Sequence, residues 1–121
     1  MDIKNSRRLT LRALKKVLPK ASVLTDLIHR HAYARDAGFY RLLPHTVIKA
    51  TTVKDIVNIF REANHRNRHV VFRAGGTSLS GQSISDDILV EVKQGWRNME
   101  VLEQGQYIVL EPGVVAARAN Q

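Results

Sequence analysis

The stretch HTVIKATTVKDIVNIFREANHRNRHVVFRAGGTSLSGQS, residues 45–83, decides the fold. Its β-branched opening at residues 45–50 predicts a strand, and the residues that follow place apolar side chains at helical spacing. Thr52 with Asp55 three residues later resembles a capping box, which marks the helix start. A second strand is predicted over residues 69–74, and a strand–helix–strand unit of this length places its strands parallel through a right-handed crossover.

The glycine-rich segment FRAGGTSLSGQS, residues 72–83, follows at the end of the second strand. Glycine permits backbone conformations closed to other residues and leaves no Cβ in the way, so consecutive N–H groups can converge on one anion. A hydrogen bond to a charged acceptor contributes about 1.5–3 kcal/mol, so several donors together offset the desolvation of a pyrophosphate. The segment predicts a phosphate-binding loop that combines glycines with hydroxyls, namely Gly75, Gly76, Gly81, Thr77, Ser78, Ser80 and Ser83.

Two familiar phosphate loops do not match this segment. A nucleoside-triphosphatase P-loop requires lysine after its last glycine, but Gln82 occupies that position. A Rossmann fingerprint opens a helix, whereas after Gly81 the chain runs through QSISDD into a predicted strand. On composition alone, a plain polar loop that joins two strands remains an alternative.

The flanks of this stretch predict further helices and strands. An amphipathic helix is expected over residues 6–18, ending at Pro19, and Ser22 is expected to cap a second short helix that runs to about Arg30. A strand is predicted over DILVEV, and two more strands are predicted in MEVLEQGQYIVLEPG, joined at Gln104-Gly105. The fold class is therefore α+β, with N-terminal helices followed by a β-α-β unit and antiparallel strands.

Length and composition limit the number of domains and the kinds of chemistry that this chain can carry. The 121 residues fit one domain, and the absence of cysteine excludes disulfides, iron–sulfur ligation and a cysteine nucleophile within this chain. No apolar run approaches the roughly 20 residues of a membrane-spanning helix and no signal peptide is recognised, so a cytoplasmic location is expected. The net charge of +8 attracts anions of any kind, so local motifs must identify the partner.

Two segments resemble a known family. RAGGTSLSGQS resembles the pyrophosphate-binding loop of FAD-linked oxidases of the vanillyl-alcohol oxidase and p-cresol methylhydroxylase (PCMH) type. YARDAGFYRLLPHTVIKATTVKDIV, residues 33–57, resembles the branch that contains glycolate oxidase FAD subunits and D-lactate dehydrogenases. The resemblance covers about residues 29–117. It implies a helical lead-in over residues 1–44 and, over residues 45–121, the first, pyrophosphate-binding subdomain of a PCMH-type FAD-binding domain, truncated at its C-terminus.

The resemblance also implies which residues bind the cofactor. Main-chain amides in residues 74–83 would wrap the FAD pyrophosphate, and LEPGVV resembles a second family segment near the flavin, although a plain turn fits it equally well. Some members attach flavin through a loop histidine, but Thr77 and Ser78 stand here, which implies non-covalent FAD. The expected cofactor-binding residues are Arg73, Ala74, Gly75, Gly76, Thr77, Ser78, Leu79, Ser80, Gly81, Gln82, Ser83, Pro112 and Gly113.

The parent enzyme, by the same resemblance, would oxidise a 2-hydroxy acid such as D-lactate or glycolate by hydride transfer to FAD. Electrons would pass to an iron–sulfur cluster in a C-terminal region. The substrate cap and the catalytic base would lie outside residues 1–121, so no catalytic residue and no activity are expected of this chain alone. An apolar strand edge or face would then be exposed, and self-association of the fragment is expected.

The main alternative is a nucleic-acid-binding module that uses the basic residues of the first helix, Arg7, Arg8, Arg12, Lys15 and Lys16. It lacks interleaved aromatic residues and any recognised nucleic-acid motif, so no nucleic-acid partner is expected. Contact of the same helix with an anionic membrane surface stays open.

Isolated side chains carry weaker signals. The five histidines form no metal-binding motif, so no metal site is expected. Tyr33 and Asp36 fit a turn or capping role better than a role beside the cofactor. Trp96 is expected to pack against an edge. Arg73 fits either phosphate binding or a surface ion pair.

Overall fold

The computed structural model describes residues 2–121. Its helices are α1 (Ile3–Val17), α2 (Leu27–Ala32), α3 (Val53–His65) and α4 (Ala116–Ala119), and its strands are β1 (Val23–Leu24), β2 (Thr46–Lys49), β3 (Val70–Arg73), β4 (Ile88–Glu91), β5 (Met99–Leu102) and β6 (Tyr107–Leu110). Short 3₁₀ turns lie at Lys20–Ser22 and Glu103–Gly105. No helix among these residues is both long and apolar enough to cross a membrane.

Four strands form one sheet in the order β1-β2-β4-β3. The predicted strands β2 and β3 are parallel to each other, but β4 lies between them and pairs with both in parallel register, while β1 is antiparallel to β2. Ile88, Leu89 and Val90 are at most 2% exposed, so β4 is covered on both faces as a central parallel strand must be. The C-terminal ends of three parallel strands therefore meet at one edge of the sheet.

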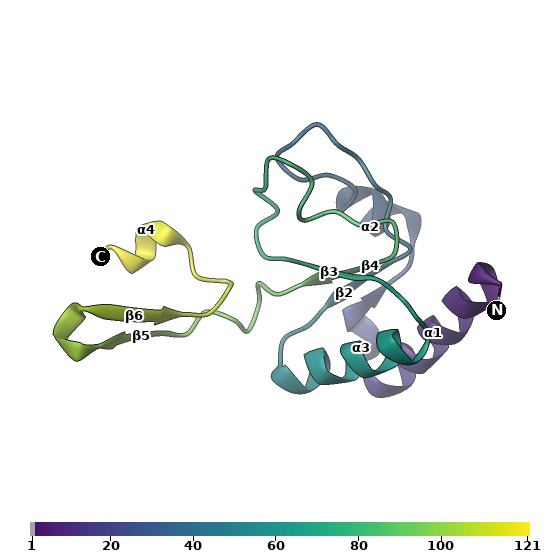
Figure 1. Ribbon diagram of the computed structural model, residues 1–121, viewed down its shortest axis with the longest axis horizontal. Coiled ribbons are helices and arrows are strands. Elements are labelled where there is room, and N and C mark those ends of the chain that lie inside the picture. The colour runs from purple at the N-terminus through teal and green to yellow at the C-terminus, as the bar shows by residue number, and fades with distance from the viewer. Residues whose placement is uncertain (1) are drawn as a thin grey trace.

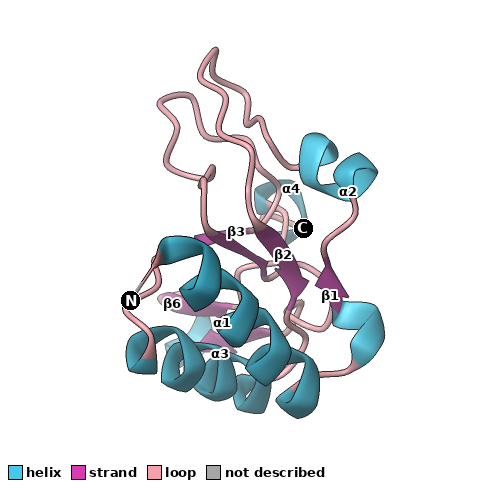
Figure 2. Cartoon of the chain, turned by 90° about the vertical axis from the view of Figure 1, so that its right-hand side faces the viewer, coloured by secondary structure: helices cyan, strands magenta, loops and turns pink. Residues whose placement is uncertain are grey.

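Helices α1 and α3 lie side by side on one face of this sheet (Figure 2). The capping box at the start of α3 is confirmed, because Thr52 Oγ1 accepts from the Asp55 amide at 3.2 Å and Asp55 Oδ2 accepts from the Thr52 amide at 3.1 Å. Helix α1 ends before Pro19 as predicted, and it begins earlier than predicted because the Asp2 carboxylate caps it. The main core lies between these helices and the sheet and consists of Leu14, Leu18, Val23, Ile48, Ala50, Ile59, Ala63, Ile88, Val90 and Val92.

The predicted start of the second helix is wrong. Ser22 ends a 3₁₀ turn, and the chain then pairs with β2 through β1 because Val23 is buried in the core. Helix α2 begins only after Asp26, whose carboxylate accepts from the His29 amide at 3.1 Å. Burial of an apolar side chain stabilises a fold by about 1.5–3 kcal/mol, which outweighs the local helix signal of one serine.

Strands β5 and β6 form the predicted antiparallel hairpin, which projects away from the sheet (Figure 1). Its connection lies at Gln104 and Gly105, as the sequence predicts, and both residues have positive φ. All eight strand residues are exposed, including the apolar Val101 at 61% and Val109 at 54%. The hairpin therefore has no apolar partner among residues 2–121.

Candidate functional site

The glycine loop, residues 74–83, leaves the sheet at the edge where β2, β3 and β4 end. Open α/β sheets bind ligands at this carboxyl edge. A second connection, residues 33–41, lies against the glycine loop, and both rise above the face of the sheet opposite α1 and α3 (Figure 2). We refer to residues 33–41 as the backing segment.

Five successive amides of the glycine loop lack acceptors among the described residues. None of the amides from residue 75 to residue 79 donates to a backbone or side-chain acceptor among residues 2–121. The Ser80 amide donates to Gln82 Oε1 at 3.1 Å. Ser83 Oγ is buried and also lacks a partner in the described chain. Residues 75–79 are exposed or half-buried, so their amides are accessible and can donate to a ligand that the protein itself does not supply.

One cavity of about 310 Å³ joins the two segments that the sequence singled out. The N-terminal half of the glycine loop lines it with Ala74, Gly75 and Thr77, and the chain after β6 lines it with Pro112 and Gly113. Residues nearly 40 positions apart in the sequence thus face the same space. The remaining lining residues are Lys93, Val114, Val115 and Ala116.

Gly113 makes this approach possible. Its amide donates to the Trp96 carbonyl at 2.7 Å, and a Cβ on Gly113 would overlap the carbonyls of both Lys93 and Trp96. Any larger residue would push residues 112–116 away from the glycine loop. Lys93 was not identified from the sequence, and only its place just beyond β4 could have suggested it.

The C-terminal half of the glycine loop does not line this cavity and faces the backing segment instead. A Cβ on Gly38 would lie 2.5 Å from the Leu79 carbonyl, and a Cβ on Gly81 would lie 3.5 Å from the Tyr40 ring. Asp36 Oδ1 accepts from the Gly38 amide at 2.8 Å, so the predicted turn role of Asp36 is confirmed. The other predicted residues of this half are Ser78, Ser80, Gln82 and Ser83.

Arg73 points to the backing segment. Its guanidinium donates to the carbonyl of Arg35 at 3.1 Å and to that of Tyr33 at 3.4 Å, and it lies 5.1 Å from the centre of the Tyr33 ring. The Tyr33 hydroxyl in turn donates to a Glu91 carboxylate oxygen at 2.6 Å. Burial raises the pKa of Tyr33, and the hydrogen bond to Glu91 and the charge of Glu91 raise it further, so the phenol stays protonated.

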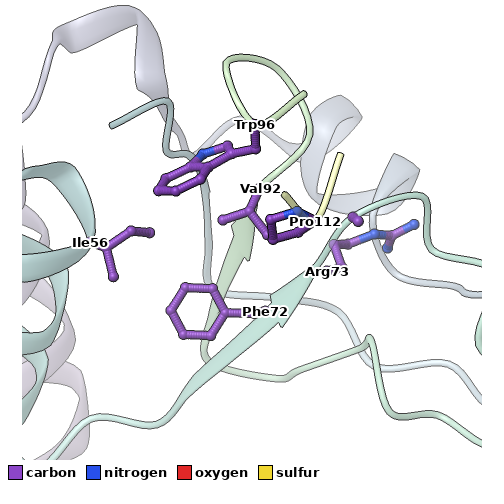
Figure 3. A pocket seen from close by; sticks show the side chains of 7 residues that line it. Ile56, Phe72, Arg73, Val92, Trp96 and Pro112 are labelled. Atoms are coloured by element: carbon purple, nitrogen blue, oxygen red, sulfur yellow. The ribbon is translucent and has the colours of Figure 1, made fainter. Parts of the chain in front are cut away.

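An apolar cavity of about 460 Å³ adjoins the first and shares Ala74 and Pro112 with it. Phe72, Trp96 and Ile56 face this space in Figure 3. The Trp96 indole N–H donates to the Ala50 carbonyl at 2.8 Å and its ring packs against the core, which confirms its predicted packing role. The sheet edge thus combines free amides with a neighbouring apolar surface. That combination suits a ligand with an anionic part and an apolar part.

Residues 2–121 contain no group of three histidine, aspartate or glutamate side chains placed to hold a metal ion.

Known proteins share this fold and sequence pattern. The FAD binding domain family matches residues 44–121. D-2-hydroxyglutarate dehydrogenase of Haemophilus influenzae is 29% identical over 106 residues, which cover 84% of this chain and 10% of that protein. The enzyme of the same name from Escherichia coli is 29% identical over 101 residues, with 80% and 10% covered. The chain spans about a tenth of the length of these curated relatives.

The structure of p-cresol methylhydroxylase with substrate bound superimposes with a TM-score of 0.74 at 14% identity, covering 97% of this chain and 24% of that protein. At that identity the likeness shows the fold alone. It confirms the α+β architecture that the sequence predicts for the first part of a PCMH-type domain. Because the family match covers residues 44–121, well over half of the chain, this protein belongs to the FAD binding domain family.

Proposed function

We propose that residues 45–121 supply the pyrophosphate-binding part of a non-covalent FAD site in an FAD-linked oxidoreductase. One observation carries the proposal: a row of amides without protein acceptors, residues 75–79, lies at the carboxyl edge of three parallel strands. Each hydrogen bond from such a donor to a phosphate contributes about 1.5–3 kcal/mol. Three or four of them would offset the desolvation of the diphosphate.

The residues at this edge fit the cofactor. Gly76 and Gly81 have positive φ, which lets successive amides turn toward one anion. The Ser83 hydroxyl, in the half of the loop that faces the backing segment, is a further donor without a partner in the described chain. Lys93, in the cavity that Gly75 and Thr77 line, adds positive charge beside them. Bound FAD supplies the hydride acceptor. The role of this chain is to hold the pyrophosphate of the cofactor. The glycine loop contains no histidine for covalent attachment, so we propose that FAD binds non-covalently.

The substrate we propose is a 2-hydroxy acid, oxidised by the full-length protein. The relatives named D-2-hydroxyglutarate dehydrogenase favour a 2-hydroxy dicarboxylate over the D-lactate or glycolate that the sequence suggests. Any iron–sulfur cluster that accepts the electrons would bind outside residues 1–121, because this chain contains no cysteine.

The test is FAD binding by the full-length protein and by a variant that blocks the amides without disturbing the fold. A Cβ on Gly75 meets nothing closer than Thr77 Cγ2 at 3.7 Å, so Gly75→Val should fold, but its side chain would crowd the anion. We expect the wild-type apoprotein to quench FAD fluorescence on binding, and the FAD-loaded protein to release yellow flavin on acid precipitation. We expect Gly75→Val to bind FAD at least about tenfold more weakly, equivalent to loss of about 1.4 kcal/mol.

Ala37→Val is the matched control, because Ala37 is exposed in the backing segment and lines neither cavity. Its FAD affinity should equal that of the wild type. A wild-type protein that binds no FAD would refute the proposed function. If that protein were also retained on DNA with a steep dependence on salt, the nucleic-acid alternative would replace it.

A further inference from the structure

Arg73 occupies the space in which a side chain at position 76 would lie. Gly76 has φ +68°, and a Cβ built on it would overlap the Arg73 guanidinium, with Cζ at 2.5 Å. The guanidinium therefore packs directly behind the Gly76 Cα. It therefore contacts the glycine loop within the run of residues 75–79, whose amides have no acceptor in the described chain.

The same guanidinium is fixed from its other side. The backing segment supplies two carbonyl acceptors, from Tyr33 and Arg35, and the Tyr33 ring lies within cation–π distance. Tyr33 is itself held by its hydrogen bond to Glu91, which lies opposite Arg73 in the register of β3 and β4. A chain of contacts thus runs from the central strand through Tyr33 and Arg73 to Gly76.

We infer that Arg73 is a positioning residue for the proposed FAD site: it holds the glycine loop from behind, through the backing segment, and does not bind the pyrophosphate itself. The inference rests on the proposed function. Two sets of contacts favour this role over direct phosphate binding. The Nη1 atom of Arg73 donates to two backbone carbonyls of the backing segment, and its Nη2 and Cζ atoms lie where a Cβ on Gly76 would be.

A planar fork is needed for this role. Arginine places several N–H donors in one plane and can bond two carbonyls while it packs against Gly76, whereas a lysine ammonium is a point charge on a flexible stem. A direct phosphate ligand would behave differently, because lysine keeps the charge and binds phosphate well. The two roles therefore predict opposite results for Arg73→Lys.

The experiment is a double-mutant cycle in the full-length protein with Arg73→Ala, Gly76→Ala and both together, plus Arg73→Lys. FAD affinity is measured by titration of each apoprotein. We expect Arg73→Ala and Arg73→Lys to weaken FAD binding alike, by roughly tenfold or more. We expect the double variant to bind FAD at least about tenfold more tightly than the product of the single effects predicts, because removal of the guanidinium makes room for the new methyl group.

Melting temperatures of the same apoproteins give a second readout. The double variant should melt higher than Gly76→Ala alone, since the overlap is relieved. A merely structural role would lower the melting temperature of Arg73→Ala while the FAD affinity of the folded protein stayed at the wild-type value. Riboflavin, which lacks the pyrophosphate, serves as a second ligand. Arg73→Ala should reduce the ratio of FAD affinity to riboflavin affinity.

The positioning role would be overturned if Arg73→Lys bound FAD with near wild-type affinity and if the loss of affinity in the double variant equalled the product of the two single losses. The proposed FAD site would remain intact. Failure of the wild-type protein to bind FAD would overturn the proposed function, and the role of Arg73 with it.

Discussion

The two edges of the parallel sheet use their polar groups differently. At the carboxyl edge, the amides of residues 75–79 have no acceptor in the described chain. At the amino edge, Asp87 is used within the protein: its carboxylate pairs with Arg68 and accepts from the His69 amide at 3.0 Å, and its carbonyl accepts from the His45 amide at 2.8 Å. Arg68 Nε at the amino edge is nevertheless buried without an acceptor, so the two edges differ in the five successive free amides and not in any single unpaired donor.

The amino edge should carry the larger share of the stability. The side chains of Arg68 and Asp87 are 4% and 6% exposed, and loss of one partner of a buried ion pair costs about 3–5 kcal/mol. Asp87→Ala is therefore expected to lower the free energy of unfolding by about that amount in urea titrations. The neighbouring Asp86→Ala, at an exposed position, should change it by less than about 0.5 kcal/mol. Equal effects at the two positions would contradict the buried pair.

Gly113→Ala tests how the carboxyl edge is assembled. Its Cβ would overlap two carbonyls, and such overpacking costs about 1–3 kcal/mol. We expect FAD affinity to fall along with stability, because residues 112–116 would move off the cavity that they share with the glycine loop. Gly105→Ala is the control: Gly105 has φ +92° and nothing within 4 Å of its Cβ, so only backbone strain should appear and FAD affinity should not change. Unaltered FAD binding by Gly113→Ala would remove Pro112 and Gly113 from the site.

Two buried serines in the connection between β3 and β4 should give opposite results. Ser83 Oγ has no partner, whereas Ser85 Oγ accepts from the Asp87 amide at 3.0 Å. Ser83→Ala should leave the apoprotein as stable or slightly more stable and weaken FAD binding several-fold, since a hydrogen bond contributes about 0.5–1.5 kcal/mol. Ser85→Ala should lower the free energy of unfolding by about 1 kcal/mol without a change in FAD affinity. Chemical denaturation and FAD titration of both variants check this contrast. Equal changes in stability and in FAD affinity for the two variants would contradict the different roles of Ser83 and Ser85.

The smallest expected effect concerns pH at the amino edge. Burial lowers the pKa of His45 below 6.5, and the positive charges of Arg7, Arg30 and Arg68 lower it further, against a smaller opposing effect of Asp87. Well above pH 6.5 the imidazole is neutral in both the folded and the unfolded state. As the pH falls below 6.5 the unfolded chain binds a proton that the folded protein resists, so stability declines. His45→Gln should reduce this decline between pH 7 and pH 5 in urea titrations, and a variant with an unchanged slope would refute the assignment to His45.

Much of the local structure is predictable from the residues alone. The capping box at Thr52 and the apolar spacing behind it place α3, and the β-branched runs place β2, β3 and β4, because these signals depend on neighbours in the chain. The glycine pattern likewise predicts where an anion could bind. The start of α2 is not predictable in the same way, since Val23 is drawn into the core and into pairing with β2.

Local sequence patterns were enough to predict α1, α3 and the strands β2 to β6, the glycine loop and the family, but not β1 or α4. Tertiary structure alone decided that β4 lies between β2 and β3, that Pro112 and Gly113 share a cavity with Ala74, and that Arg73 lies behind Gly76. The physical reason is range. Helix and turn signals act over a few residues, whereas strand order and the burial of a side chain depend on contacts between segments far apart in the chain.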